Sequence, residues 1–74
     1  MNQLVECVPN FSEGRDEKII SEIRQAIESV SGIEVLDVDM GADTNRTVVT
    51  FVGSPGVISE AAFQGVKRAS ELID

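Results

Sequence analysis

The order of hydrophobic periods along this chain restricts the folds open to it more than any other feature. Short runs rich in valine, leucine and other strand-forming residues predict strands over 3–8, 33–39 and 46–53. Apolar residues at steps of one, three and four predict amphipathic helices over about 16–30 and 55–74. The predicted order is therefore β-α-β-β-α.

Residues with special backbone properties support these boundaries. Pro9 has no N–H to continue a ladder, so the first strand is expected to stop there. Asp16 is placed to cap the first helix, and Gly32 is placed to end it in a left-handed conformation. Ser54 followed by Pro55 predicts a hydroxyl cap and then proline in the first turn of the second helix.

One further strand would complete a split β-α-β, or ferredoxin-like, arrangement, in which two helices cover one face of a sheet ordered 4-1-3-2. The predicted fold class is therefore α+β, an incomplete ferredoxin-like sandwich with an antiparallel or mixed sheet and a missing fourth strand. The second helix reaches Asp74 without a glycine or basic residue to end it. We expect residues 1–74 to form one partial domain, either a shortened version or a natural fragment of a longer protein.

Charge and cysteine content exclude several classes of partner. The chain has 13 acidic and 6 basic residues, a formal charge of −7, whereas nucleic acid and anionic membranes need a concentrated positive surface. The single cysteine, Cys7, cannot form an internal disulfide, and its place in a strand favours a buried, inert thiol. With no run of membrane-spanning length and no signal-like start, a cytoplasmic protein is expected.

The predicted topology gathers polar residues at one end of the sheet. The turn after the first strand, the turn between the second and third strands and the end of the second helix all lie there. The opposite end holds only the short segments 30–32 and 53–56. A site is therefore expected at the first end, whose candidates are Asn10, Ser12, Glu13, Arg15, Asp39, Asp43, Asn45 and Arg46.

Ordinary structural roles compete with these functional ones. Pro9, Gly14 and Gly41 are typical of turns, and short polar side chains such as Asn10 and Ser12 readily bond to nearby backbone. Two aspartates, at 37 and 39, alternate with apolar residues in the second strand. The polar side that they create is either a solvated sheet face or a face covered by another domain.

Several motif classes do not fit. The chain has no histidine, which excludes a histidine-based triad, metal site or proton shuttle within it. Segment 37–48 lacks the ligand pattern of a calcium loop, and segment 53–56 lacks the ending of a phosphate-binding loop. We expect no metal in this chain.

Three segments together resemble a known family. They are LVECVPNFSEGRD near the start, LDVDMGADTNRTVVTFVG in the middle and ASELID at the end. In this order and spacing they resemble the beginning of glutamate formiminotransferase (formimidoyltransferase), and the resemblance covers essentially the whole chain. It implies transfer of the formimino group from N-formimino-L-glutamate to tetrahydrofolate, a step in histidine degradation, although related members use formyl-glutamate.

The resemblance also implies where the chemistry takes place. The family's transferase has two similar α/β subdomains that face each other across a substrate cleft, sometimes with a fused cyclodeaminase, and this chain matches only the beginning of the first. The family's catalytic histidine lies shortly after the segment LID, so no catalytic residue is expected among these 74 and the isolated chain is expected to be inactive. The substrate-binding residues expected here are Asn10, Ser12, Arg15, Asp39, Asn45 and Arg46.

Their roles are inferred from position and residue type. Asn10, Arg15, Asn45 and Arg46 would donate hydrogen bonds to carboxylates or to a tetrahedral intermediate. Asp39 would orient a histidine or hold a protonated amidine. The alternative is a non-catalytic ferredoxin-like module that binds a small molecule or a partner, in which every loop residue has an ordinary turn role.

A missing fourth strand has a consequence under either interpretation. It leaves the first strand as an edge that no proline or lysine within the run protects, and it leaves one sheet face bare. A domain of this size has little stability to spare. We therefore expect homo-oligomers, in which strand 3–8 pairs with another chain or the open sheet face is covered.

Overall fold

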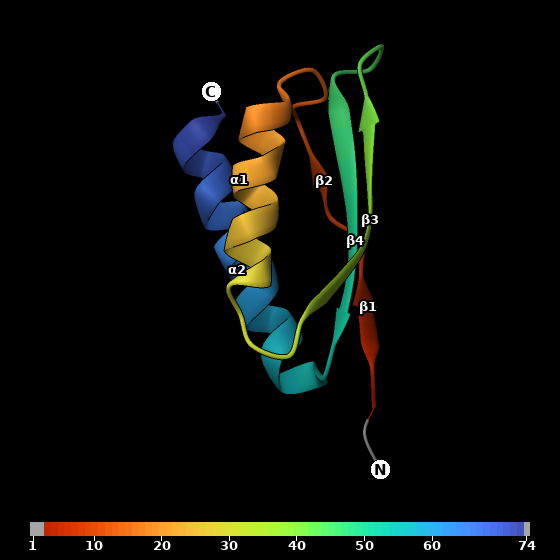
Figure 1. The fold of residues 1–74 in the computed structure, drawn as a ribbon, viewed down its shortest axis with the longest axis vertical. Helices are drawn as coiled ribbons and strands as arrows, with labels where there is room; N and C mark the ends of the chain where they lie inside the picture. The colour runs from red at the N-terminus through yellow and green to blue at the C-terminus, as the bar shows by residue number, and fades with distance from the viewer. Residues whose placement is uncertain (1–2, 74) are drawn as a thin grey trace.

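The computed structural model describes residues 3–73. Two helices lie on one face of an open sheet, and the opposite face is uncovered by any described element (Figure 1). The elements are β1 (Val5–Cys7), β2 (Asn10–Phe11), α1 (Glu17–Glu28), β3 (Glu34–Gly41), β4 (Arg46–Gly53) and α2 (Pro55–Leu72). This is the predicted α+β, ferredoxin-like arrangement, with β1 and β2 together in the place of the first predicted strand.

The long strand β4 is the centre of the sheet. It pairs with β3 along one side and with both β1 and β2 along the other, and every pairing is antiparallel. The predicted neighbour order of the first three strands is therefore confirmed, and the sheet of the described residues is antiparallel rather than mixed. The outer edge of β1 and β2 pairs with no other described strand.

The expectation that the first strand stops at Pro9 is only half right. Pro9 has no N–H to donate to β4, so the ladder is interrupted between Cys7 and Asn10. Its carbonyl oxygen nevertheless accepts a hydrogen bond from Val49 N–H at 3.1 Å. Pairing with β4 therefore resumes at β2, which carries the chain two residues further along the same strand.

An irregularity in β3 sorts its polar and apolar residues onto different faces. Strict alternation would put Val35 on the same face as Asp37 and Asp39, because these three residues are separated by steps of two. Instead, the register with β4 shifts between Val35 and Asp37, and Leu36 is turned outward with half of its surface exposed. Val35 and Val38 consequently pack towards the helices, and the two aspartates face the open side.

One apolar cluster between the helices and the sheet forms the core. From α1, Ile23 and Ile27 are fully buried, and from β4, Val49 and Phe51 are fully buried. Full burial of side chains of this size contributes about 1.5–3 kcal/mol each. Cys7, predicted to be buried, is only partly so and packs at the margin of this cluster.

The helix termini agree with the sequence at two of four points. Asp16 caps α1, since its side chain accepts hydrogen bonds from the N–H groups of Lys18 and Ile19. Gly32 has the expected positive φ of 90°, but it does not end the helix, because α1 ends at Glu28 with Ser29 as a right-handed C-cap. Pro55 begins α2 as predicted. The predicted hydroxyl cap is wrong, because the Ser54 side chain makes no capping bond and only its carbonyl oxygen accepts hydrogen bonds from the first turn. The predicted last residue of this helix, Asp74, lies outside the described residues.

An ion-pair cluster joins the two helices at the surface. Arg68 of α2 pairs with Glu22 of α1 and, at 3.0 Å, with Glu71 of its own helix. Hydrogen bonds raise the pKa of Arg68 above its ordinary value, with the bond to Glu71 contributing most and the bond to Glu22 next. Such exposed pairs contribute little stability, so the helices are held chiefly by the apolar cluster.

Candidate functional site

Three segments meet at one end of the sheet, as the topology predicts. They are the loop 12–16 that joins β2 to α1, the hairpin loop 42–45 between β3 and β4, and the last turn of α2 (Figure 1). The opposite end holds the turn after α1 and the short link before α2. All six predicted substrate-binding residues lie at the first end or on the strands that lead to it.

Gly14 allows the loop 12–16 to touch the backbone of the hairpin. This residue is buried, and a Cβ atom built on it would lie 2.5 Å from the Arg46 nitrogen and 2.7 Å from the Arg46 carbonyl oxygen. It would be closer still to the carbonyl oxygen of Gly41. No other residue type fits without moving one backbone segment away from the other.

Three hydrogen bonds join the same two segments, and we call them the latch. The Gly14 N–H donates to Asn45 Oδ1 at 2.9 Å, and Arg15 Nε donates to the Ala42 carbonyl oxygen at 3.0 Å. The Thr47 hydroxyl donates to the carbonyl oxygen of Glu13. Thr47 is fully buried, so this third bond also satisfies a hydroxyl that has no access to water.

Asn45 combines two properties that the latch requires. Its φ is +54°, and it is the one non-glycine residue with a positive φ in the described part of the chain. Asparagine tolerates this left-handed conformation better than most residues. The turn that results, closed by an Asn45 N–H to Ala42 carbonyl bond of 3.3 Å, presents the Asn45 side chain to the loop 12–16.

Two acidic residues of the loop organise its own backbone. The Glu13 carboxylate accepts hydrogen bonds from the N–H groups of Arg15 at 3.1 Å and Asp16 at 2.9 Å. Asp16 in turn caps α1. These carboxylates therefore shape the passage from loop to helix.

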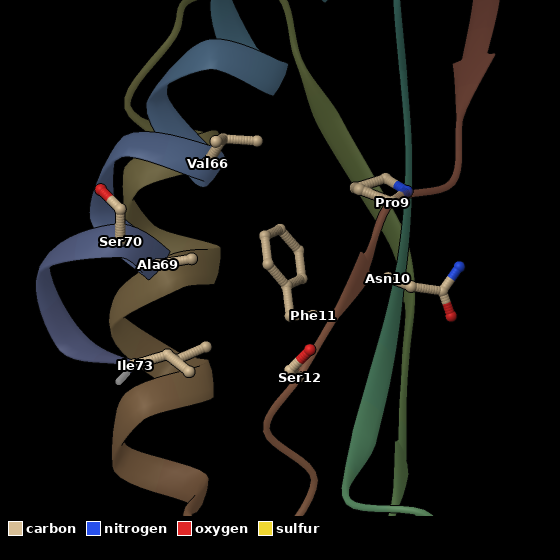
Figure 2. Close-up of a pocket in the computed structure, with 8 residues that line it drawn as sticks. All are labelled: Pro9, Asn10, Phe11, Ser12, Val66, Ala69, Ser70 and Ile73. Carbon is tan, nitrogen blue, oxygen red and sulfur yellow. The ribbon is translucent and has the colours of Figure 1, made fainter.

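A second group of polar residues lies on the open face of the sheet. Since Thr47 and Val49 are buried under the helices, alternation places Arg46 and Val48 on the opposite side of β4. Asn10 and Asp39 pair with Val48 from either side, so the three residues form a row across the sheet. Figure 2 shows the Asn10 side chain pointing away from α2.

The charges on this face are unevenly distributed. Arg46 is the only basic residue within the four described strands. Four acidic residues, all exposed, pair with the outward-facing positions of β4: Glu6, Glu34, Asp37 and Asp39. Within residues 3–73, the side chains of Asn10, Asp39 and Arg46 make no hydrogen bond or ion pair. A ligand that binds to this face of the sheet would therefore find one positive charge among acidic neighbours.

A shallow groove of about 310 Å³ lies on the other side of the sheet, between β2 and the second half of α2. Figure 2 shows Phe11 pointing across it towards the helix, opposite Val66 and Ala69. Ser12 lines the same groove, and so does Asn10, although its side chain points away from α2 (Figure 2). The groove follows the unpaired outer edge of the sheet, so it differs from the open face in both place and chemistry.

The structure thus divides the predicted substrate-binding residues among three places. Asn10, Asp39 and Arg46 share the open face, Arg15 and Asn45 belong to the latch, and Ser12 lines the groove. The sequence interpretation did not include Thr47, although its alternation with Val49 on one face of β4 places it towards the core and at the site end.

Two further observations bear on the kind of site. Among residues 3–73, no three His, Cys, Asp or Glu side chains gather closely enough to hold a metal ion. No helix of this part of the chain is both long and apolar enough to cross a membrane.

Comparison with known proteins agrees with the resemblance found in the sequence. Residues 4–74 match the family described as the formiminotransferase domain, N-terminal subdomain. The chain is 58% identical over 74 residues to the formimidoyltransferase-cyclodeaminase of Dictyostelium discoideum and 55% identical over 74 residues to that of Rattus norvegicus, covering 100% of this chain and 14% of each relative. It is 54% identical over 71 residues to the glutamate formimidoyltransferase of Thermoplasma acidophilum, covering 96% of this chain and 23% of that protein.

The chain therefore spans between 14% and 25% of the length of the curated relatives it matches. The match runs from residue 4 to residue 74 and includes every element and loop described above. The chain belongs to the family of formiminotransferase N-terminal subdomains.

Proposed function

We propose that the protein containing this chain transfers the formimino group from N-formimino-L-glutamate to tetrahydrofolate, a step in histidine degradation. Family membership supports the proposal, as does the similarity to relatives that are glutamate formimidoyltransferases. Tetrahydrofolate is then a second substrate that accepts the group. Residues 1–74 would form part of the N-terminal subdomain of this enzyme.

The observation that best supports a binding role is the position of Arg46. Its guanidinium is always charged and can bond a carboxylate through two N–H groups, and both proposed substrates carry carboxylates. Asn10, on the same face, would donate to the tetrahedral intermediate. Asp39 would hold the protonated amidine of the formimino group or orient a histidine supplied from outside these residues, since the chain itself has none.

The latch residues Arg15 and Asn45 would contribute less to substrate binding, because each already uses one polar atom in the latch. Arg15 uses Nε to hold the Ala42 carbonyl oxygen, and Asn45 uses Oδ1 to hold Gly14. Their remaining donors, the two terminal nitrogens of Arg15 and Nδ2 of Asn45, would still be able to reach a carboxylate at this end. Ser12 would contribute from the side of the groove.

Arg46→Ala in a complete formiminotransferase carrying this segment tests the assignment. A lost charge-assisted contact costs about 1.5–3 kcal/mol, so kcat/KM for formimino transfer should fall roughly ten- to a hundredfold with little change in Tm. Arg24→Ala is the matched control, because Arg24 is an exposed arginine of α1 whose pair with Glu28 is at the surface. Absence of transfer by the purified wild-type protein would overturn the proposed function, and unchanged kinetics in Arg46→Ala would remove Arg46 from it.

Two further expectations accompany this function. A cytoplasmic location stays a prediction, supported by the single cysteine Cys7. We also propose that the 74-residue chain on its own associates with copies of itself. The outer edge of β1 is unpaired in the described sheet, and Leu4, directly before β1, is 72% exposed.

A further inference from the structure

We propose that Asn45 is a positioning residue for substrate binding, because it fixes the direction in which Arg46 projects from the sheet. The inference rests on the proposed function, in which Arg46 binds a substrate carboxylate. Asn45 itself need not touch the substrate. It would act through the backbone of its neighbour.

The Arg46 side chain has no partner of its own to fix it. It makes no hydrogen bond or ion pair with any of residues 3–73, and it is exposed. A long flexible side chain of this kind can be directed only by the backbone from which it projects. Any preorganisation of its guanidinium must therefore come from the residues on either side.

The latch holds the backbone on both sides of Arg46. On one side, Asn45 is in the left-handed conformation and accepts the Gly14 N–H. On the other side, buried Thr47 donates to the Glu13 carbonyl oxygen. Between them, the Arg46 nitrogen and carbonyl oxygen lie so near Gly14 that a Cβ atom built there would come within 2.7 Å of both.

This arrangement also determines the face to which Arg46 belongs. Thr47 is held on the helix side of β4, so Arg46 must project to the open side, towards the row that contains Asn10 and Asp39. If the turn at Asn45 relaxed, the first residue of β4 would lose its fixed register with Gly41. Substrate binding would then have to restore an orientation that the latch otherwise provides in advance.

Variants of Asn45 separate its two properties. Asn45→Asp keeps an acceptor and tolerates positive φ, whereas Asn45→Gly keeps the conformation and removes the acceptor. In a complete formiminotransferase, we expect Asn45→Gly to raise KM for N-formimino-L-glutamate roughly three- to tenfold, with kcat within about twofold, the size of one lost hydrogen bond. Asn45→Asp removes the Nδ2 donor and adds a negative charge beside Arg46, so its readout is the protection of the Gly14 amide, which should stay as in wild type.

A double-mutant cycle with Arg46→Gln tests whether Asn45 acts through Arg46. Asn45→Gly should have no further effect on KM once Arg46 is replaced. An equal effect in both backgrounds would overturn the inference. Ile27→Val is the stability control, since Ile27 is fully buried in α1 and makes no part of the latch; it should lower Tm and leave KM unchanged.

Hydrogen exchange in the same complete proteins gives a readout independent of activity. The Gly14 amide, whose acceptor is Asn45 Oδ1, should exchange at least several-fold faster in Asn45→Gly than in wild type or Asn45→Asp, as should peptides that cover 44–47. Unchanged exchange in Asn45→Gly would overturn the inference even if KM rose. If wild-type protein shows no formimino transfer, the proposed function fails, and exchange still decides whether Asn45 holds this backbone.

Discussion

Gly14→Ala should destabilise the fold by about 3 kcal/mol, although it adds one methyl group. The added Cβ would lie within 2.7 Å of two Arg46 backbone atoms and also against the Gly41 carbonyl oxygen, and overpacking of this kind costs about 1–3 kcal/mol. Because the neighbours are backbone, relief requires the loop to lift. If the loop moved away, the buried Thr47 hydroxyl would lose its acceptor, and leaving it unpaired would lower the free energy of unfolding by about 1–3 kcal/mol.

The matched control is Gly56→Ala, the same chemical change in the first turn of α2, where an added Cβ meets no atom within 4 Å. This change should be neutral or stabilise by up to about 1 kcal/mol. Urea and thermal unfolding measure both variants. For a domain of this size, about 3 kcal/mol corresponds to a Tm lower by roughly 12–24 °C. If Gly14→Ala melted within about 2 °C of wild type, the close contact between loop and hairpin would not be present in solution.

Three other outcomes follow from the same structure. Asp16→Ala should cost about 0.5–2 kcal/mol in urea unfolding, since Asp16 caps α1, whereas Ser54→Ala should cost almost nothing because its hydroxyl caps nothing; equal losses would contradict this. The purified 74-residue chain should show no formimino transfer in a spectroscopic assay, since it has no histidine, and turnover would refute that expectation. The isolated chain should form dimers or larger species at micromolar concentration, with slow hydrogen exchange at residues 4–8, and a monomer with fast exchange there would refute pairing through β1.

Local sequence signals predicted the fold well where one residue determines the outcome. The limits of β4 coincide with the predicted range 46–53, Asp16 caps α1 as predicted, and Gly32 has the predicted left-handed conformation although α1 ends before it. Two features depended on partners that the local sequence does not reveal. Pairing resumes after Pro9 because its carbonyl oxygen still has a donor in Val49, and the irregularity at Leu36 is a shift in the register between β3 and β4.

The candidate site was less predictable than the fold. Topology correctly predicted which loops meet, but it gave no means of separating side chains that stabilise their meeting from side chains that face outward. Asn45 and Arg46 are neighbours of similar polarity, yet one accepts a bond from Gly14 and the other makes no bond to the described chain. The left-handed conformation of Asn45 and the burial of Thr47 separate the roles of the two residues. The first directs the Asn45 side chain to the loop 12–16, and the second leaves Arg46 on the open face.

Alternation along β4 explains how one short segment serves both purposes. Residues at odd positions from Thr47 onward face the helices, so Thr47 can anchor the loop through its hydroxyl while Val49 and Phe51 fill the core. The intervening positions, beginning with Arg46, are left for the open face. Moving the hairpin turn by one residue would exchange these two sets, burying the guanidinium and exposing the hydroxyl. The left-handed residue that fixes the turn therefore determines whether β4 presents its positive charge on the open face.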